Sequence, residues 1–389
     1  MIISSQQELE DACKAISVAN EIAIDTEFFN QTDYSYFHKL STIQIAWLDE
    51  SSALKSILID VMSDKITNYS SIKKIFTNQK ILKIIHSAKN DLGVIYGFFG
   101  VKIINIFDTQ IAFCMCGNVK TMPSYGLLVE MFLEKEVEKS QQMAKWQKRP
   151  LTNEMIKYAI NDVVYLIDLK NILYKKLVEI GNNGYFSSEM EIISRSFNEK
   201  KFSIYKKNKI DFDLSNLEKS RLAKVLEYRQ NIAAELNLKP DILISNAEIV
   251  EISRMPYSSL QKNKSHFNAI EGYIENTQQD DWCEINPVFN NNAISRDLLK
   301  KNQKILNTKL NDVSKKLKIS KFLIISTDDF KALCLMISAN YDPRKDLPRY
   351  FTGWRFDVFG SKILSYIEDT LVGDSDQKID FLPASIALE

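Results

Sequence analysis

Two carboxylates stand together at the end of the first apolar run, "EIAIDTEFFN". Ile22 and Ile24 predict a β-strand, because apolar and β-branched residues are typical of buried strands. Asp25 and Glu27 follow with one residue between them, so on a strand their side chains point the same way. They repel each other unless a positive group lies between them. The triplet alone is weak evidence, since a solvent-exposed strand end has the same pattern.

Two further segments add acids to separate elements. In "IIHSAKNDL" an apolar strand runs into a turn, and Asp91 follows near the start of the next helix. Its structural alternative is an acid that stabilises the helix dipole. In "KYAINDVVYL" Tyr158 and Asp162 lie four residues apart, so they share one face of a predicted helix. That face otherwise carries apolar residues, and a buried carboxylate there needs a compensating partner.

A bound divalent metal ion would balance the charge of the acids in all three segments. Clustered carboxylate oxygens without His or Cys ligands favour Mg²⁺ or Mn²⁺ over zinc. Two such ions about 3.5–4 Å apart can activate a water and stabilise the leaving oxygen of a phosphoryl displacement. A tyrosine beside them can hold the attacking water. The pattern therefore indicates metal-assisted phosphodiester chemistry.

Chain length indicates the number of domains, but the net charge does not indicate the chemical class of a binding partner. The chain has 389 residues, which favours two or three domains, and its 50 Lys+Arg balance 50 Asp+Glu. Residues 200–210 hold five lysines and no acid, and residues 300–321 hold eight lysines and one acid. Such basic segments suit an anionic partner, but a solvated helix face has the same composition.

Several classes of protein are disfavoured by what the sequence lacks. The five cysteines are scattered without the spacing of a zinc site or redox dithiol, which predicts reduced thiols. The first residues show no secretory signal pattern, and no apolar run approaches the ~20 residues of a membrane span. We therefore expect a cytoplasmic protein without membrane association. A Gly-rich phosphate loop is missing, which argues against an ATPase or helicase.

The periodicity predicts an α/β domain followed by helices. Up to about residue 180, apolar strands alternate with amphipathic helices, which is typical of a central sheet covered by helices. Beyond "GNNGYF" strands nearly vanish, and two similar helical blocks follow a Lys-rich segment. The predicted strands after the first are residues 41–49, 56–61, 81–87 and 102–109, and the predicted helices include 4–16, 70–78, 90–100 and 152–180.

With these residues in view, the sequence resembles a known family. "DTEF", "HSAKNDL" and "YAINDVVYL" are similar to the three motifs of the tyrosine-type DEDD 3′–5′ exonucleases. More narrowly the chain resembles ribonuclease D, with "FDTQIA" and residues 133–152 as connecting segments. The helical blocks resemble HRDC domains. The order and spacing of the motifs are far more specific than any one of them.

The resemblance implies a fold and its division into domains. The α/β part would be a ribonuclease-H-like exonuclease domain with a mixed central sheet, followed by two small all-α HRDC-like domains. The implied parts are an exonuclease domain (1–195), a basic linker (196–209), a first helical domain (210–288), a second, divergent one (289–372) and a C-terminal tail (373–389).

The resemblance also implies the site. Asp25, Glu27, Asp91 and Asp162 would hold two divalent metal ions, Mg²⁺ or Mn²⁺, and Tyr158 would orient the attacking water. The reaction would be hydrolysis of the 3′-terminal phosphodiester of RNA, with release of nucleoside 5′-monophosphates. Implied substrates are tRNA precursors and other small structured RNAs with single-stranded 3′ ends. We expect a monomer. Alternatives are a DNA-directed exonuclease with the same site and a catalytically silent RNA-binding protein.

For four further residues the sequence leaves both a functional and a structural role open. Trp146 could stack on a base and Arg149 could meet a phosphate, or Trp146 could pack under the helix while Arg149 pairs locally. Phe28 could wedge against the terminal base or belong to the core. Asp108 starts a predicted helix after a strand, which favours a helix cap over a fifth metal ligand.

Overall fold

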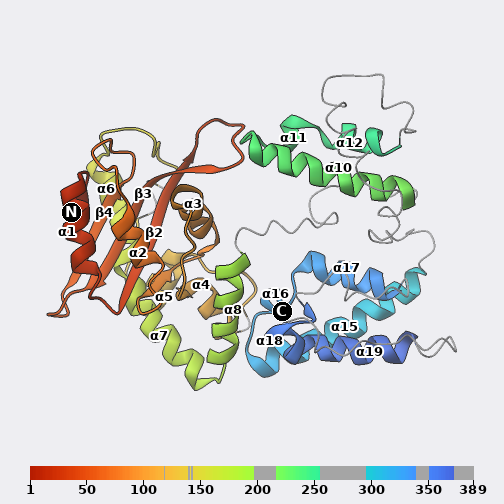
Figure 1. Cartoon of the computed structure of the whole chain (residues 1–389). Helices are drawn as coiled ribbons and strands as arrows, with labels where there is room; N and C mark the ends of the chain where they lie inside the picture. The colour runs from red at the N-terminus through yellow and green to blue at the C-terminus, as the bar shows by residue number, and fades with distance from the viewer. Residues whose placement is uncertain are drawn as a thin grey trace. The chain divides into compact units, whose positions relative to one another are not determined.

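The chain divides into two compact units, Met1–Val288 with Leu317–Ser320, and Phe289–Lys316 with Lys321–Glu389. Figure 1 shows its elements in a computed structural model. The structure describes residues 1–117, 119–138, 141, 143–196, 216–254, 295–338 and 350–371. The predicted linker beyond residue 196 and the predicted tail lie outside these residues, and the boundary at residue 195 stays a prediction.

A six-stranded mixed sheet forms the centre of the first unit. Its order is β1-β4-β3-β2-β5-β6. β3 pairs antiparallel with β2 and β4, whereas β5 pairs parallel with β2 and β6, and β1 pairs parallel with β4. This confirms the predicted mixed sheet, apart from β1, whose two residues are too few for a sequence pattern. The strands are β1 (Ile2–Ile3), β2 (Glu21–Asn30), β3 (His38–Leu48), β4 (Leu54–Asp60), β5 (Leu82–Ile85) and β6 (Ile106–Asp108).

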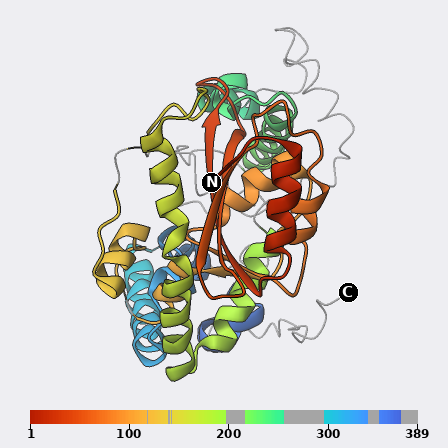
Figure 2. The ribbon, with the colours of Figure 1, turned by 90° about the vertical axis from the view of Figure 1, so that its left-hand side faces the viewer.

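Helices cover both faces of this sheet. α1 lies against one face and α6 against the other (Figure 2). Sandwiched in this way, the strands are apolar on both sides, and Ile22, Ala23 and Ile24 of β2 are all fully buried. The helices here are α1 (Gln6–Ile16), α2 (Ser70–Phe76), α3 (Lys89–Phe99), α4 (Thr109–Cys114), α5 (Tyr125–Leu133), α6 (Asn153–Val164), α7 (Leu166–Glu179) and α8 (Asn183–Ser196).

Local sequence signals set where these helices begin and end. Ser5 and Glu8 form a reciprocal capping box at the start of α1. Gly100 ends α3 in the left-handed conformation, with φ of 70°, as its position predicts. Thr152 caps α6 by accepting a hydrogen bond from the Met155 amide. The predicted helical segment 152–180 is two helices that meet at Tyr165.

The first unit continues into three helices of the first predicted helical block. α10 (Asn216–Glu235), α11 (Pro240–Leu243) and α12 (Asn246–Arg254) surround a small apolar core that includes Val225, Leu226 and Ile249. The buried Arg229 side chain fastens this block, because its Nη1 donates to the Ile244 carbonyl (2.7 Å) and to Asn246 Oδ1 (2.9 Å).

The second unit is helical throughout its described residues. The exposed side chains of its long helix α15 include Lys300, Lys301 and Lys304, whereas Leu306 and Leu310 on its other face are buried. No helix within the described ranges is both long enough and apolar enough to cross a membrane. The elements are α15 (Arg296–Leu317), α16 (Lys321–Ile324), α17 (Thr327–Ser338), α18 (Gly353–Arg355), the π-helix η4 (Phe356–Gly360) and α19 (Ser361–Leu371).

Asp108 links the end of β6 to two helices. The side chain is 3% exposed and caps α4 by accepting from the Gln110 and Ile111 amides (2.8 and 3.2 Å). It also accepts from the Ser87 and Ala88 amides (3.1 and 2.8 Å), which lie just before α3. The predicted role of Asp108 as a helix cap is confirmed by its bonds to the start of α4.

Replacing Asp108 should therefore destabilise the protein. Asp108→Ala leaves four backbone N–H groups without their acceptor. We expect the free energy of unfolding to fall by at least about 2 kcal/mol, because each orphaned buried donor costs roughly 1–3 kcal/mol. Urea unfolding of the full chain measures this, with Asp108→Asn, which keeps one oxygen acceptor, as an intermediate control. An unchanged midpoint in Asp108→Ala would contradict the assignment.

Candidate active site

Strand β2 brings the first two acids to one face of the sheet. Asp25 lies opposite Gln44 of β3 and Glu27 opposite Thr42, in regular antiparallel register. The register shifts only after Glu27, at a bulge before Phe28. The i, i+2 relation that the sequence predicts is therefore preserved up to the second acid.

Helix α6 adds the third acid and the tyrosine. It packs across β2, β3 and β4, with Met155, Ala159 and Val163 buried. Asp25, Glu27 and Asp162 each offer a carboxylate oxygen, and these oxygens lie within 4.8 Å of one another. Tyr158 is 9% exposed, one helical turn before Asp162. Three of the four predicted ligands thus meet beside the predicted tyrosine.

Asp91 lies near this trio but is not part of it. Its side chain, in the first turn of α3, is buried and accepts a hydrogen bond from Thr26 Oγ1 (2.5 Å). Its charge nevertheless acts on both Asp25 and Glu27. The fourth predicted acid therefore lies next to the cluster, and its role as a ligand stays a prediction.

Burial and mutual repulsion oppose ionisation of these groups. Burial, with the charges of Asp162 and Asp91, raises the pKa of Glu27 to about 9. Burial and then the other three acids hold the pKa of Asp25 well above its usual range. Burial also raises the pKa values of Asp91 and Asp162 to about 7, although hydrogen bonds from Thr26 and Tyr158 partly offset it.

These properties fit a divalent cation. The donor set is composed of carboxylate oxygens, which suit hard ions such as Mg²⁺ or Mn²⁺. A cation between the oxygens would offset both the burial and the repulsion that raise the pKa values. The chemistry of Asp25, Glu27 and Asp162 therefore matches the predicted metal site.

Trp146 belongs to the core, which corrects its predicted stacking on a base. Its side chain is 2% exposed and packs with Leu58, Met155 and Ala159. The indole lies beside the Tyr158 ring, with 6.3 Å between the ring centroids. An indole enclosed in this way has no face to offer a nucleotide, so the packing alternative holds.

Arg149 is paired locally, which corrects its predicted contact with a phosphate. Its Nε and Nη2 donate to the two carboxylate oxygens of Asp60 at 2.7 and 2.6 Å. Nη1 donates to the Trp146 and Lys148 carbonyls (2.9 and 2.8 Å), and Nη2 also donates to Ser41 Oγ (3.1 Å). All five N–H donors of a guanidinium are engaged, so none remains for a phosphate.

Phe28 and Tyr125 complete the surroundings of the acids. Phe28 is partly exposed just beyond the bulge, and its ring centroid lies 4.7 Å from that of His38. Its predicted contact with the terminal base stays a prediction.

Tyr125 is a neighbour of the acids that the sequence did not predict. Its hydroxyl donates to the Asn161 carbonyl (2.8 Å) beside Asp162, and burial, with the charges of Asp162 and Asp25 among smaller causes, raises its pKa. The local sequence at the start of α5 contains no signal that places Tyr125 near the acids.

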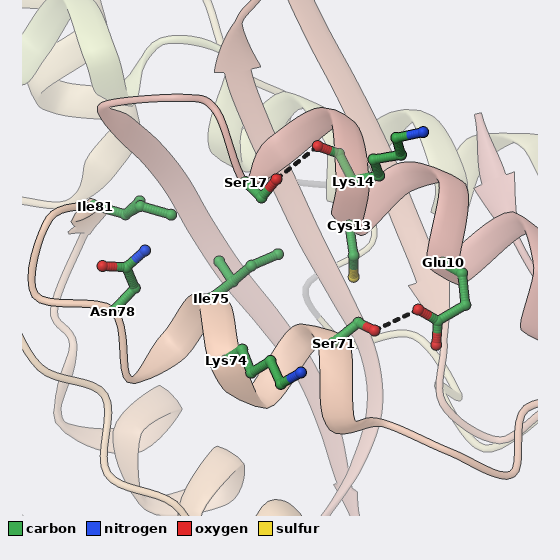
Figure 3. Close-up of a pocket in the computed structure, with 9 residues that line it drawn as sticks. All are labelled: Glu10, Cys13, Lys14, Ser17, Ser71, Lys74, Ile75, Asn78 and Ile81. Carbon is green, nitrogen blue, oxygen red and sulfur yellow. Dashed lines mark hydrogen bonds between the residues drawn. The ribbon is translucent and has the colours of Figure 1, made fainter.

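A separate cavity of about 250 Å³ lies between α1 and α2 (Figure 3). Its walls include Cys13, Lys14, Ser71 and Lys74, and the Ser71 hydroxyl donates to Glu10. Asp25, Glu27, Asp91 and Asp162 are not among its lining residues, although Glu10 is. The acid cluster is therefore separate from this cavity.

Comparisons with known proteins agree with this geometry. Residues 1–178 match a family described as 3′–5′ exonuclease. Ribonuclease D of Bartonella henselae is 26% identical over 385 residues, which cover 93% of this chain and 88% of the relative. Ribonuclease D of Desulfotalea psychrophila is 30% identical over 257 residues, 64% of this chain and 66% of the relative. The crystal structure of Escherichia coli RNase D matches with a TM-score of 0.74 at 23% identity, covering 95% of this chain and 98% of that one.

Residues 1–178 thus form a 3′–5′ exonuclease domain. The chain is similar along most of its length to curated ribonuclease D proteins, and this similarity supports a 3′–5′ exoribonuclease. The structural match confirms the predicted architecture, an exonuclease domain followed by a helical C-terminal region.

The raised pKa values predict how stability depends on pH without metal. Unfolded Asp and Glu titrate near 3.8 and 4.5, whereas the folded-state pKa is about 7 for Asp162 and about 9 for Glu27. Between about pH 4 and pH 9 the folded state therefore binds more protons, so these groups lower the free energy of unfolding as pH rises. Thermal unfolding in a chelator should show this decline, and it should be shallower in Asp162→Asn.

Added Mn²⁺ should reverse the trend, because metal binds the deprotonated carboxylates and stabilises the fold more at higher pH. If the difference between wild type and Asp162→Asn in chelator were independent of pH, the electrostatic account of the cluster would be wrong.

Proposed function

We propose that this protein is a metal-dependent 3′–5′ exoribonuclease. It hydrolyses the 3′-terminal phosphodiester of RNA and releases nucleoside 5′-monophosphates. The observation that carries the proposal is the meeting of three carboxylates within 4.8 Å, beside Tyr158, in an exonuclease domain. The similarity to ribonuclease D along the chain supports RNA as the substrate.

Two divalent ions, Mg²⁺ or Mn²⁺, are the proposed cofactors. Asp25, Glu27 and Asp162 would hold them, and Asp91 would contribute from the adjacent position. Ions bound there supply charge to the scissile phosphate and acidify the attacking water. The rigid β2–β3 pair and α6 hold the ligands in place before the ions arrive, which limits the reorganisation needed for binding.

Tyr158 positions the water in this proposal. Burial and the charge of Asp162 raise the pKa of Tyr158, so its phenol stays protonated at neutral pH. The hydroxyl donates to Asp162 and retains lone pairs that can accept from a water. Its contribution is orientation, which matters because a misplacement of 1 Å can cost about 10²-fold in rate.

The proposed substrates are structured small RNAs with single-stranded 3′ ends, tRNA precursors among them. The E. coli relative is described as an exoribonuclease involved in structured RNA processing. Cytoplasmic location and a monomeric state stay predictions of the sequence. A DNA-directed exonuclease would use the same acids, and a silent RNA-binding protein would use none of them.

The first test is nucleotide release from a single-stranded RNA labelled at its 3′ end. Wild type should release 5′-monophosphates only with Mg²⁺ or Mn²⁺, and Asp25→Asn should lower the rate at least ~10³-fold, because a lost ligand removes several kcal/mol of transition-state stabilisation. Asp64→Asn, which changes an exposed acid outside the acid cluster and outside α15 in the same way, is the matched control and should keep full activity.

Equal rates for wild type and Asp25→Asn would reject the site. Faster turnover of a matched DNA oligonucleotide would favour the DNA-directed alternative. Binding of RNA without any release would favour the silent RNA-binding protein.

The exposed lysines of α15 are proposed contacts to RNA phosphates. Neutralising Lys300, Lys301 and Lys304 to Gln should weaken RNA binding and lower the slope of log affinity against log salt by about 2, since each single-strand phosphate contact contributes about 0.7. Fluorescence anisotropy over a salt series measures this slope.

The control variant removes three positive charges from a part of the chain outside α15. Lys14, Lys65 and Lys74 are also exposed, but they lie in the exonuclease domain around α1 and α2. Their triple Gln variant should keep the wild-type slope. Equal slopes for all three proteins would show that the α15 lysines form only a solvated face.

A further inference from the structure

We infer that Arg149 positions Tyr158 through Trp146, as part of a partly buried anchor made of Ser41, Asp60 and Arg149. The inference rests on the proposed function, because Tyr158 matters only if it orients the attacking water. Arg149 is then a positioning residue that touches neither substrate nor metal. The chain of contacts runs from the sheet to the loop before α6 and ends at the tyrosine.

The first step is the guanidinium of Arg149. Two of its nitrogens bond the two oxygens of Asp60 at 2.7 and 2.6 Å, a bidentate geometry that fixes the plane of the group as well as its position. The side chains of the pair are only 25% and 13% exposed, so water competes weakly for them. A lysine could offer Asp60 a point charge but not this fork.

The second step is the backbone of Trp146. Its carbonyl accepts from Arg149 Nη1 (2.9 Å) and from Ser41 Oγ (2.6 Å). Ser41 lies in β3 and Asp60 at the end of β4, and the neighbouring residue Thr42 pairs directly with Asp60. Two adjacent strands therefore hold one peptide group of the segment that leads into α6.

The third step is the ring of Tyr158. The Trp146 indole lies beside it at 6.3 Å between centroids and an interplanar angle of 42°. Leu58 of β4 and Met155 of α6 close the same cluster. If the Trp146 backbone shifts, the indole moves with it, and the phenol loses the surface that fixes its direction toward Asp162.

This arrangement predicts a specific kinetic signature. Arg149→Lys should lower kcat about tenfold or more, because misplacement of a positioning group is costly, while KM and RNA affinity stay within twofold of wild type. A residue that contacted a phosphate would instead raise KM. Lys55→Gln, which breaks the exposed ion pair between Lys55 of β4 and Asp49, is the matched control and should leave kcat unchanged.

A double-mutant cycle with Tyr158→Phe separates positioning from general loss of structure. Once the hydroxyl is gone, its orientation has no further effect, so Arg149→Lys in the Tyr158→Phe background should lower kcat by no more than about twofold. Independent, multiplying losses would overturn the inference. If Arg149→Lys fails to fold, Ser41→Ala removes a single donor from the Trp146 carbonyl and should show the same non-additivity with a smaller loss.

A readout without turnover keeps the inference apart from the proposed function. 3-Fluorotyrosine placed at position 158 reports the ring environment by ¹⁹F NMR. Its resonance should shift or broaden in Arg149→Lys and remain unchanged in Lys55→Gln. An inactive wild type with this spectral response would refute the proposed function alone, whereas an unchanged resonance in Arg149→Lys would refute the anchor.

Discussion

The repulsion among Asp25, Glu27 and Asp162 is the constraint on which the rest of this structure depends. Left alone, three carboxylates this close would separate or take up protons. Burial first and repulsion second raise the pKa values of Asp25 and Glu27, and burial raises that of Asp162. What prevents separation is the packing of α6 across three strands, with Ala159 and Val163 fully buried. Hydrophobic burial thus holds in place a charged arrangement that is unfavourable until a cation binds.

The residues that the sequence predicted well are those whose relation is local. Asp25 and Glu27 are fixed by the alternation of a strand, and Tyr158 and Asp162 by one turn of a helix, so both pairs follow from secondary structure. Asp91 was placed near the site by a strand–turn–helix pattern, but local pattern could not show that its carboxylate accepts from Thr26. The fold class followed equally from alternating periodicities.

The errors concern residues whose partners are distant in the chain. Arg149 donates hydrogen bonds to Asp60 and Ser41, which lie 89 and 108 residues earlier in the chain. Local sequence patterns cannot predict contacts between residues so far apart. In isolation an arginine and a tryptophan before a helix that carries candidate site residues have the composition of a nucleic-acid contact. Only tertiary packing shows that Trp146 is buried and that Arg149 is paired locally. Tyr125 was missed for the same reason.

The carboxylate of Asp108 has a consequence for the electrostatic potential of the site. It lies close enough to Asp91 to raise the pKa of that acid, so it adds to the negative potential that attracts cations. Its Oδ1 already accepts from three backbone N–H groups and its Oδ2 from a fourth, so both oxygens take part in backbone hydrogen bonds. The fold thereby gains the field of a fifth acid from a side chain whose position is fixed by the starts of α3 and α4.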